Sequence, residues 1–242
     1  MAYAPVWRGA PVTAAEGQKP HRIDLHCHTS ASFDGRVDPL RLVQLARERG
    51  LTHLAITDHE TLDGVRRAGE VDTAGVTLII GQEARSTEGD MIALFIEQPV
   101  PSGLTPEQTA QEIRAQGGLV GLPHPFDTTR PSIGRGAVRF QELSRLALLA
   151  DYVEVHNGRV RDPRANELAA DLARDFGLPA VAVSDAHTEP EVGWCATVVN
   201  GPLHSAAQLL AALRNGTMLS VREPQVEAEG FLGQLRNRLG RT

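Results

Sequence analysis

Metal-type side chains recur along this chain at spacings of two residues. His26 and His28 form one such pair, and Asp185 and His187 form another. Residues two apart in a β-strand point to the same face, so each pair directs two donor groups to one side. Imidazole and carboxylate groups are ligands that suit divalent transition metals. The two pairs therefore predict a metal site.

Similar side chains follow the other short apolar runs of the sequence. This wider set consists of Asp34, Asp58, His59, Glu83, His124, Glu154, His156 and Asn157. A lone histidine at a strand end is most often structural or at the surface, and we interpret His21, His53 and His204 in that way. The same pattern at one strand end after another is hard to obtain by chance, and it favours one shared site.

The elements that must position these residues are short apolar runs that alternate with segments of helical period. The runs predict strands at 23–26, 54–57, 76–80, 118–122, 152–155, 180–183 and 196–199, with 91–96 as a hairpin partner of the third. The helical segments are 38–50, 62–74, 106–116, 140–149, 164–176 and 206–214. Pro39 begins the first helix, Thr105 is placed to cap the third, and Gly177 closes the fifth.

Alternation of this kind favours an α/β fold with a parallel sheet. Barrel enzymes carry their chemistry at the C-terminal ends of the strands, where residues distant in the sequence meet. Nothing between the elements has the composition of a linker, so we expect a single domain at 21–221. Residues 1–20 are predicted to form a tail, and 222–242 a polar peripheral segment.

Composition narrows the class of protein. Hydrophobic residues make up 41% of the 242, enough for a full core, and the formal net charge is -6. An acidic chain without a stripe of aromatic and basic residues is a poor match for long nucleic acid. Residues 1–20 lack the apolar run of a signal peptide, and no segment has the roughly 20 apolar residues of a membrane span. We therefore expect a cytoplasmic protein with no membrane partner.

The cysteines, Cys27 and Cys195, suggest no disulfide framework. Cys27 lies between two residues that are expected to point inward, so its own side chain should point outward. We expect it to be a small buried hydrophobe under the helices rather than a ligand. Cys195 has no base near it in the sequence and receives no role.

Four short motifs give the chain a family likeness. They are Asp24-Leu25-His26-Cys27-His28-Thr29 with Asp34-Gly35, Thr57-Asp58-His59, Gly81-Gln82-Glu83, and Ser184-Asp185-Ala186-His187. In this order and spacing they resemble the PHP (polymerase and histidinol phosphatase) family over about residues 22–200. The resemblance implies a distorted (β/α)7 TIM-like barrel that holds two or three divalent ions, usually zinc, manganese or iron, and hydrolyses phosphoesters.

The resemblance also implies how the ligands are shared. One ion would be held by His26, His28, Glu83 and Asp185. Glu83 would bridge to a second ion that His124 also binds. The third ion would be held by Asp34, His59 and His187.

Met91 stands where many family members have a further histidine. A thioether is a poor ligand for a hard divalent ion. We therefore expect the second ion to be held weakly, by Glu83, His124 and water, with His156 or Asn157 as substitutes. Glu154 is equally well placed to orient a ligand histidine from behind.

The chemistry implied is attack on phosphorus by a metal-activated hydroxide. The candidate catalytic residues are His59, His187 and Asp185, of which either histidine could protonate the leaving group. Candidate phosphate-binding residues are Arg130, Arg135 and Arg159, in loops after the fourth and fifth strands; arginine can bind two phosphate oxygens at once. The competing interpretation of each is a solvated arginine on an exposed loop.

Three functions compete at this point. The first is a phosphoesterase acting on a small phosphorylated substrate, the second a nuclease or a cyclic-nucleotide or oligonucleotide phosphodiesterase, and the third a non-catalytic metal-binding domain. The near-complete ligand set argues against the third. The acidic charge argues against long nucleic acid but does not separate a phosphomonoester from a dinucleotide.

Overall fold

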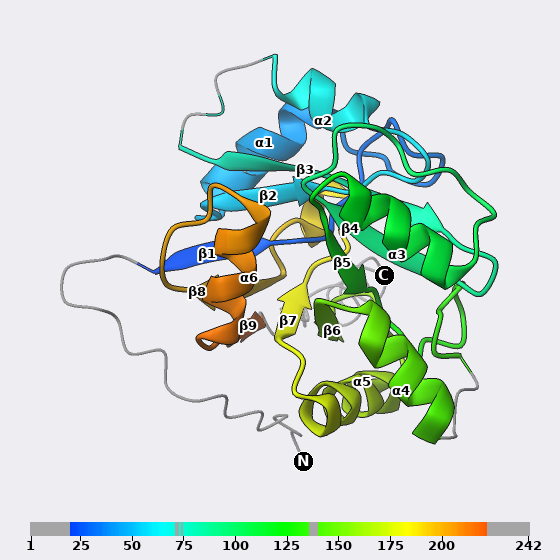
Figure 1. The fold of residues 1–242 in the computed structure, drawn as a ribbon. Helices are drawn as coiled ribbons and strands as arrows, with labels where there is room; N and C mark the ends of the chain where they lie inside the picture. Colours follow the sequence, from blue (N-terminus) through cyan, green and yellow to red (C-terminus); the bar gives the residue numbers. More distant parts are fainter. Residues whose placement is uncertain (1–19, 71–72, 74, 136–139, 222–242) are drawn as a thin grey trace, which may run out of the picture.

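The computed structural model describes residues 20–70, 73, 75–135 and 140–221 of the chain. One mixed sheet of nine strands curves into a nearly closed barrel, and helices cover its outer face (Figure 1). The strands are β1 (His21–Asp24), β2 (His53–Ile56), β3 (Thr77–Arg85), β4 (Asp90–Leu94), β5 (Leu119–Leu122), β6 (Tyr152–Asn157), β7 (Ala180–Val183), β8 (Cys195–Val199) and β9 (Met218–Val221). The predicted α/β barrel class is confirmed. The expected terminal segments at 1–20 and 222–242 lie outside the described residues, apart from residue 20.

The helices also match the predicted segments. They are α1 (Pro39–Glu48), α2 (Asp63–Ala68), α3 (Pro106–Ala115), α4 (Phe140–Leu149), α5 (Pro163–Phe176) and α6 (Ala206–Arg214). The Thr105 side chain accepts a hydrogen bond from the Gln108 backbone and caps α3, and α5 ends at Gly177, whose φ of 65° is left-handed. Only α2 is much shorter than expected, because the chain turns at Gly69.

Strand directions differ in part from the predicted parallel sheet. The order is β7-β6-β5-β4-β3-β2-β1-β8-β9, and β4 runs antiparallel to both β3 and β5. β8 is likewise antiparallel to β1 and β9. Residues 86–89 between β3 and β4 are too few for a parallel crossover, which needs about a dozen residues or more. The hairpin expected at this point is therefore confirmed, and it interrupts the β/α repeat.

Two different sets of interactions close the barrel between β1 and β7. Toward the site, the chain beyond β1 pairs with the chain beyond β7: His28 N donates to Ala186 O at 2.8 Å, and Asp185 N donates to His26 O at 2.9 Å. Toward the other end, β8 fills the gap. The Thr197 hydroxyl of β8 both accepts from the backbone N–H of β7 and donates to its carbonyl, at 2.9 Å each.

Buried apolar side chains form two clusters on the two faces of the sheet. The outer cluster joins strand residues such as Leu54 and Ile56 to α1–α5, and it also contains Cys27. The inner cluster takes the alternate residues, such as Ala55 in β2, and joins them to Leu209 and Leu213 of α6. Cys27 is thus the outward-facing hydrophobe that was predicted. Helix α6 packs against the inner cluster, away from the strand ends that carry the polar residues.

Candidate metal centre

The polar residues predicted from the strand ends come together in the structure. They lie where the parallel strands end, and their donor atoms fall into overlapping groups within 4.8 Å. The groups are His26/His28/Asp185, His28/His59/Glu83, His28/Asp34/His187 and Glu83/Asp90/His124. The eight residues that the resemblance assigns to the ions are therefore in one cluster, and Asp90 joins them.

Glu83 lies at the centre of the cluster. Its Oε2 is 3.1 Å from both His26 Nε2 and His28 Nε2, and its Oε1 is 3.1 Å from His124 Nε2. The residue is 2% exposed. One carboxylate therefore reaches two separate groups of donors, which is the geometry needed for a ligand that bridges two ions.

Asp34 reaches the cluster from the loop between β1 and α1. Its Oδ2 is 3.1 Å from His187 Nε2 and 3.5 Å from His59 Nε2. The backbone carbonyl of Asp185 accepts a hydrogen bond from His187 Nδ1 at 2.9 Å. That bond fixes the ring with Nε2 facing Asp34, so the side chain offers a free lone pair to the third group.

The structure overturns the expectation for Met91. In the β3–β4 register Met91 pairs with Ala84, and both belong to the outer apolar cluster under the helices. Asp90, one residue earlier, faces the opposite side together with Glu83. It is 2% exposed and shares a donor group with Glu83 and His124. A carboxylate thus stands where we expected a missing ligand, and the signal that could have found it is the position of Asp90 directly before the predicted strand 91–96.

A β-bulge in β6 determines which of its polar residues reach the centre. The β6–β7 register shifts between Glu154 and His156, so that Glu154 pairs with Val181 and Asn157 with Val183. Both valines belong to the inner cluster, so Glu154 and Asn157 point inward. His156 lies between them in the register and faces outward. It does not reach the centre, contrary to the expectation that it could replace a ligand.

Glu154 is fully buried behind the cluster and ties its parts together. Its Oε1 lies 2.7 Å from His26 Nδ1, while its Oε2 accepts from the His124 backbone N–H at 3.0 Å and from Asn157 Nδ2 at 2.9 Å. Asn157 Nδ2 also donates to Asp185 Oδ2 at 3.0 Å. Glu154 and Asn157 therefore position the candidate ligands rather than join them.

Two of the candidate ligands have left-handed backbone conformations. The φ angles are 28° at His124 and 53° at Asp185. Such angles are uncommon for residues other than glycine and cluster at functional sites, where the surrounding structure enforces them. Here Glu154 holds the His124 backbone N–H, and the β1–β7 pairing holds that of Asp185.

The electrostatics of the cluster favour bound cations. Burial alone would raise the pKa of the Asp185 carboxyl, but His26, His28 and Arg130 hold that pKa well below its usual range. Burial also opposes ionisation of Glu83, whose pKa the neighbouring histidines nevertheless lower. Conversely, burial would lower the pKa of His28, yet Asp185 and Glu83 raise it to about 9. The carboxylates stabilise the extra proton on the neighbouring histidines. The same negative electrostatic field attracts divalent cations.

The donor set fits divalent metal ions. Among the described residues, the buried atoms His28 Nδ1 and Asp185 Oδ1 have no hydrogen-bond partner. His26 Nε2 and His28 Nε2 lie only 2.9 Å apart. Because the Glu154 carboxylate can only accept, His26 carries its proton on Nδ1, and its Nε2 lone pair faces this gap. The lone pairs of these side chains therefore converge on a space that holds too few hydrogen-bond donors to satisfy them. Nitrogen and oxygen ligands of this kind suit zinc, manganese or iron.

A pocket of about 490 Å³ opens above the cluster. The arginines that line it are Arg36, Arg85, Arg130 and Arg159. Arg130 is held by Asp127, whose Oδ2 accepts from its Nε at 2.9 Å, and it forms an ion pair with Asp185. Two of the three predicted phosphate-binding arginines therefore line the pocket. Arg135 does not, and it is exposed.

Comparison with known proteins agrees with this architecture. The PHP domain matches residues 24–154, and a PHP-associated region matches residues 163–218. An uncharacterized protein of Methanocaldococcus jannaschii is 34% identical over 159 residues, which are 61% of this chain and 88% of that one. The error-prone DNA polymerase of Cutibacterium acnes is 31% identical over 211 residues, which cover 71% of this chain but only 19% of the polymerase.

Solved structures show the same fold. A two-domain protein from Bacteroides vulgatus, described as containing a predicted PHP-like metal-dependent phosphoesterase, superposes with a TM-score of 0.70 at 22% identity, covering 87% of this chain and 67% of that one. A lesion-specific endonuclease from Pyrococcus furiosus superposes with a TM-score of 0.64 at 16% identity, covering 83% and 58%. None of the described helices has the length and apolar character needed to cross a bilayer.

Proposed function

Because the chain belongs to the PHP domain family, we propose that it is a metal-dependent phosphoesterase that hydrolyses a small phosphorylated substrate at the mouth of its barrel. The observation that carries this proposal is the position of Glu83. Its two carboxylate oxygens face separate groups of histidines, 3.1 Å from His26 and His28 on one side and from His124 on the other.

Two or three divalent ions would be held by the overlapping donor groups of the cluster. Zinc, manganese and iron all suit this mixture of imidazole and carboxylate. Bound ions supply Lewis-acid polarisation of the phosphoryl group and lower the pKa of the attacking water. Around them, Asp34, Glu83, Asp90 and Asp185 provide the negative charge that retains cations in the pocket.

The residues of the pocket wall bind and orient the phosphoryl group. Arg130 is partly buried and is fixed by Asp127, so its guanidinium is in place before the substrate arrives. Arg159 faces the same pocket from the loop after β6. Preorganised donors of this kind stabilise the charge that develops on the non-bridging oxygens.

The leaving oxygen needs a proton donor at the pocket wall. His187 lines the pocket, and its hydrogen bond to the Asp185 carbonyl directs Nε2 away from the backbone. His59 also lines the pocket, with Nε2 3.4 Å from Glu83 Oε2. Each could deliver a proton to a leaving alcohol, and the one less engaged as a ligand is the better donor.

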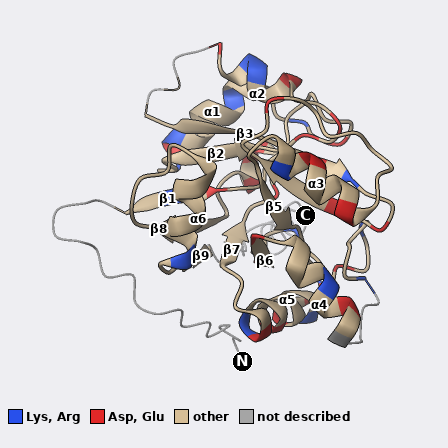
Figure 2. Cartoon of the chain, in the orientation of Figure 1, with Lys and Arg blue, Asp and Glu red and all other residues tan. Residues whose placement is uncertain are grey.

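Pocket size and surface charge support a small substrate. The volume of about 490 Å³ is typical of sites for small molecules, for which the range is roughly 300–1,000 Å³. Figure 2 shows acidic and basic residues side by side on α2, α3 and α4. The formal charge of -6 would disfavour long contact with a nucleic-acid backbone.

A panel of phosphomonoesters, tested with added manganese, zinc and iron(II), checks the proposed reaction. We expect release of inorganic phosphate that requires metal and is lost in a His26→Ala variant whose circular dichroism spectrum is unchanged. Metal-independent release, or no release from any monoester in the panel, would show that the proposal is wrong.

Phosphodiester hydrolysis is the second candidate. It is favoured by the number of arginines around the pocket, since Arg36 and Arg85 lie beyond the pair assigned to a single phosphoryl group. The endonuclease from Pyrococcus furiosus also shares this fold. Comparing p-nitrophenyl phosphate with bis(p-nitrophenyl) phosphate separates the two reactions directly.

A further inference from the structure

Phe33 is an exposed aromatic residue at the mouth of the pocket. It is 81% exposed, yet it lines the pocket together with Asp34 and His59. Its ring stacks on the imidazole of His59, with centroids 4.9 Å apart and planes inclined by 27°. One face of the phenyl ring therefore rests on a candidate ligand of the metal centre, and most of the rest is open to an incoming molecule.

The loop that carries Phe33 is held on both sides. Ser32 N donates to the Thr29 carbonyl at 3.1 Å, and the Ser32 hydroxyl donates to Asp34 Oδ1 at 2.8 Å. The same hydroxyl accepts from the His59 backbone N–H at 3.2 Å. These bonds surround the phenylalanine in sequence, so its position relative to the metal centre is fixed.

Gly35 allows the loop to turn back so tightly. A Cβ atom at this position would lie 2.0 Å from the Thr29 carbonyl oxygen, so any other residue would push the loop outward. Beyond it, Arg36 N donates to the His187 carbonyl at 2.9 Å and ties the loop to the opposite side of the pocket. A rigid, solvent-facing aromatic ring loses little conformational entropy when a flat ligand stacks on it.

We propose that Phe33 is a stacking platform for a nucleobase, and that the substrate of this site is a nucleoside phosphate. The proposal rests on the function proposed above and names its substrate class. The phosphoryl group would lie on the floor of the pocket, near Arg130 and the metal centre. The base would lie at the mouth, where it extends the stack of His59 and Phe33 by one ring.

A nucleobase fits this rim better than an aliphatic group. An offset stack of two planar rings gains energy beyond the area it buries, and every base has a face that can take part. The walls below Phe33 are formed by arginines and candidate metal ligands, which suit phosphate and sugar oxygens rather than an alkyl chain. The pocket thus combines an anionic subsite with a single flat apolar one.

Adenosine 5′-phosphate and ribose 5-phosphate are a matched pair for testing this. They share the sugar and the phosphate and differ in the base. We expect metal-loaded wild-type protein to prefer adenosine 5′-phosphate in kcat/KM and in binding measured by calorimetry. Phe33→Ala should reduce this preference by roughly 5- to 150-fold, the usual effect of removing one base–aromatic stack, with the larger loss falling on adenosine 5′-phosphate.

Two further variants separate stacking from apolar packing. Phe33→Trp keeps a flat ring and should retain the preference for the base, whereas Phe33→Leu covers His59 but offers no flat face and should lose it. Equal use of the two compounds by wild-type protein, or an equal effect of Phe33→Ala on both, would overturn the proposal while leaving phosphoester hydrolysis intact. If the protein hydrolyses neither compound, calorimetry still decides: binding of adenosine 5′-phosphate that depends on Phe33 supports the platform, and absence of such binding overturns it.

Discussion

Glu154 Oε1 accepts a hydrogen bond from His26 Nδ1 at 2.7 Å, in a part of the structure where neither side chain is exposed. The ionised carboxylate can only accept, so the bond fixes the imidazole as the tautomer with its proton on Nδ1. The Nε2 lone pair then faces Glu83 and His28. A carboxylate behind a histidine in this way orients it for metal binding and raises its basicity.

Glu154→Gln is predicted to weaken metal binding without unfolding the protein. The amide oxygen can still accept from His26, but the change removes the charge that supports the imidazole and turns an NH2 group toward the His124 N–H and the Asn157 amide. We expect metal affinity to fall by roughly 10–100-fold, the usual effect of altering the partner of a ligand histidine. Titration of metal-free protein with manganese or zinc measures it.

His156→Gln provides a control on the same strand. His156 is only two residues from Glu154 but faces outward because of the bulge in β6. We expect its replacement to leave metal affinity unchanged. Equal loss of affinity in both variants would mean that the β6 bulge does not separate these residues as the structure indicates.

The bulge also marks the limit of sequence reasoning about this strand. Strict alternation groups Glu154 with His156, since they are two residues apart. The extra residue reverses the phase and brings Asn157 inward instead. No residue type between 152 and 157 signals a bulge, so the sequence predicted the strand and the candidate residues but not which of them reach the centre.

Asp90→Ala is predicted to weaken the ion shared by Glu83 and His124. Asp90 supplies the third carboxylate or imidazole donor of that group. Its loss should leave one ion that exchanges readily, so the variant should need added metal for full activity as the site refills by mass action. Elemental analysis before and after dialysis measures the number of retained ions.

Met91→His tests whether Met91 itself occupies a ligand position. Met91 is fully buried in the outer apolar cluster, so an imidazole there is a polar group without a partner. We expect a lower melting temperature and no gain in metal affinity. A gain in affinity would restore the original interpretation, in which Met91 occupies a ligand position.

The error over Met91 has a physical origin. The resemblance placed a ligand after Glu83 but could not set the phase of the hairpin, which depends on the register between β3 and β4. That register pairs Ala84 with Met91 and Arg85 with Asp90. By contrast, the pairs at 26/28 and 185/187 converge as predicted, because each directly follows a strand of the barrel, β1 or β7.

Asp185→Asn is predicted to abolish turnover while the fold persists. Asparagine is similar in size and tolerates the left-handed conformation that this position requires, with φ at 53°. It cannot supply the negative charge that Arg130, His26 and His28 share. We expect at least one ion fewer per chain and loss of measurable hydrolysis, with an unchanged circular dichroism spectrum. Unfolding of this variant would indicate that the metal is structural.

The direction of β8 is a second feature that the sequence did not predict. Its apolar run reads like any other strand, and the β/α repeats of the chain as a whole favoured a parallel sheet. The segment between β7 and β8 contains only a 3₁₀ turn at Glu189–Glu191. Without a full crossover helix the chain must reverse, so β8 runs antiparallel beside β1 and completes the barrel.

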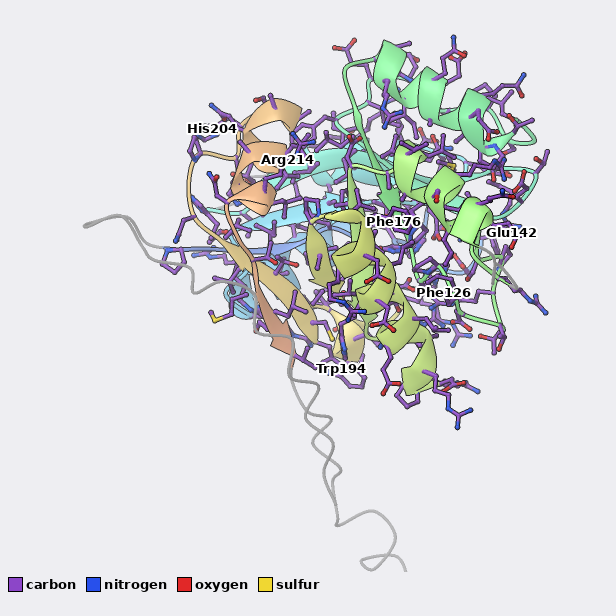
Figure 3. The ribbon with its side chains drawn as sticks, turned by 60° about the horizontal axis from the view of Figure 1, so that its bottom comes forward. Phe126, Glu142, Phe176, Trp194, His204 and Arg214 are labelled. Atoms are coloured by element: carbon purple, nitrogen blue, oxygen red, sulfur yellow. The ribbon has the colours of Figure 1, made fainter. Side chains whose placement is uncertain are left out.

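The last prediction concerns His53 and pH. His53 begins β2, 4% exposed, with its ring edge-on to His21 at 5.0 Å. Figure 3 shows His204 beside α6, on the side of the barrel away from Trp194. Burial first, and then the nearby His21 and His204, lower the pKa of His53 to about 4.

In the unfolded chain the pKa of a histidine is about 6.5. Above that pH both states are neutral at His53, and the residue adds no pH dependence. Between about pH 6.5 and pH 4 the unfolded state binds a proton that the folded state does not, so stability falls by at most about 1.4 kcal/mol per pH unit.

His53→Asn should lack this contribution. The free energy of unfolding of both proteins can be measured with urea at pH 7 and pH 5. Between these two pH values the wild type should lose about 2 kcal/mol more stability than the variant. Other acid-sensitive groups, including those of the metal centre, are common to both proteins and cancel in this difference. Stability curves that stay parallel from pH 7 to pH 5 would show that His53 is protonated as readily in the folded protein as in the unfolded chain.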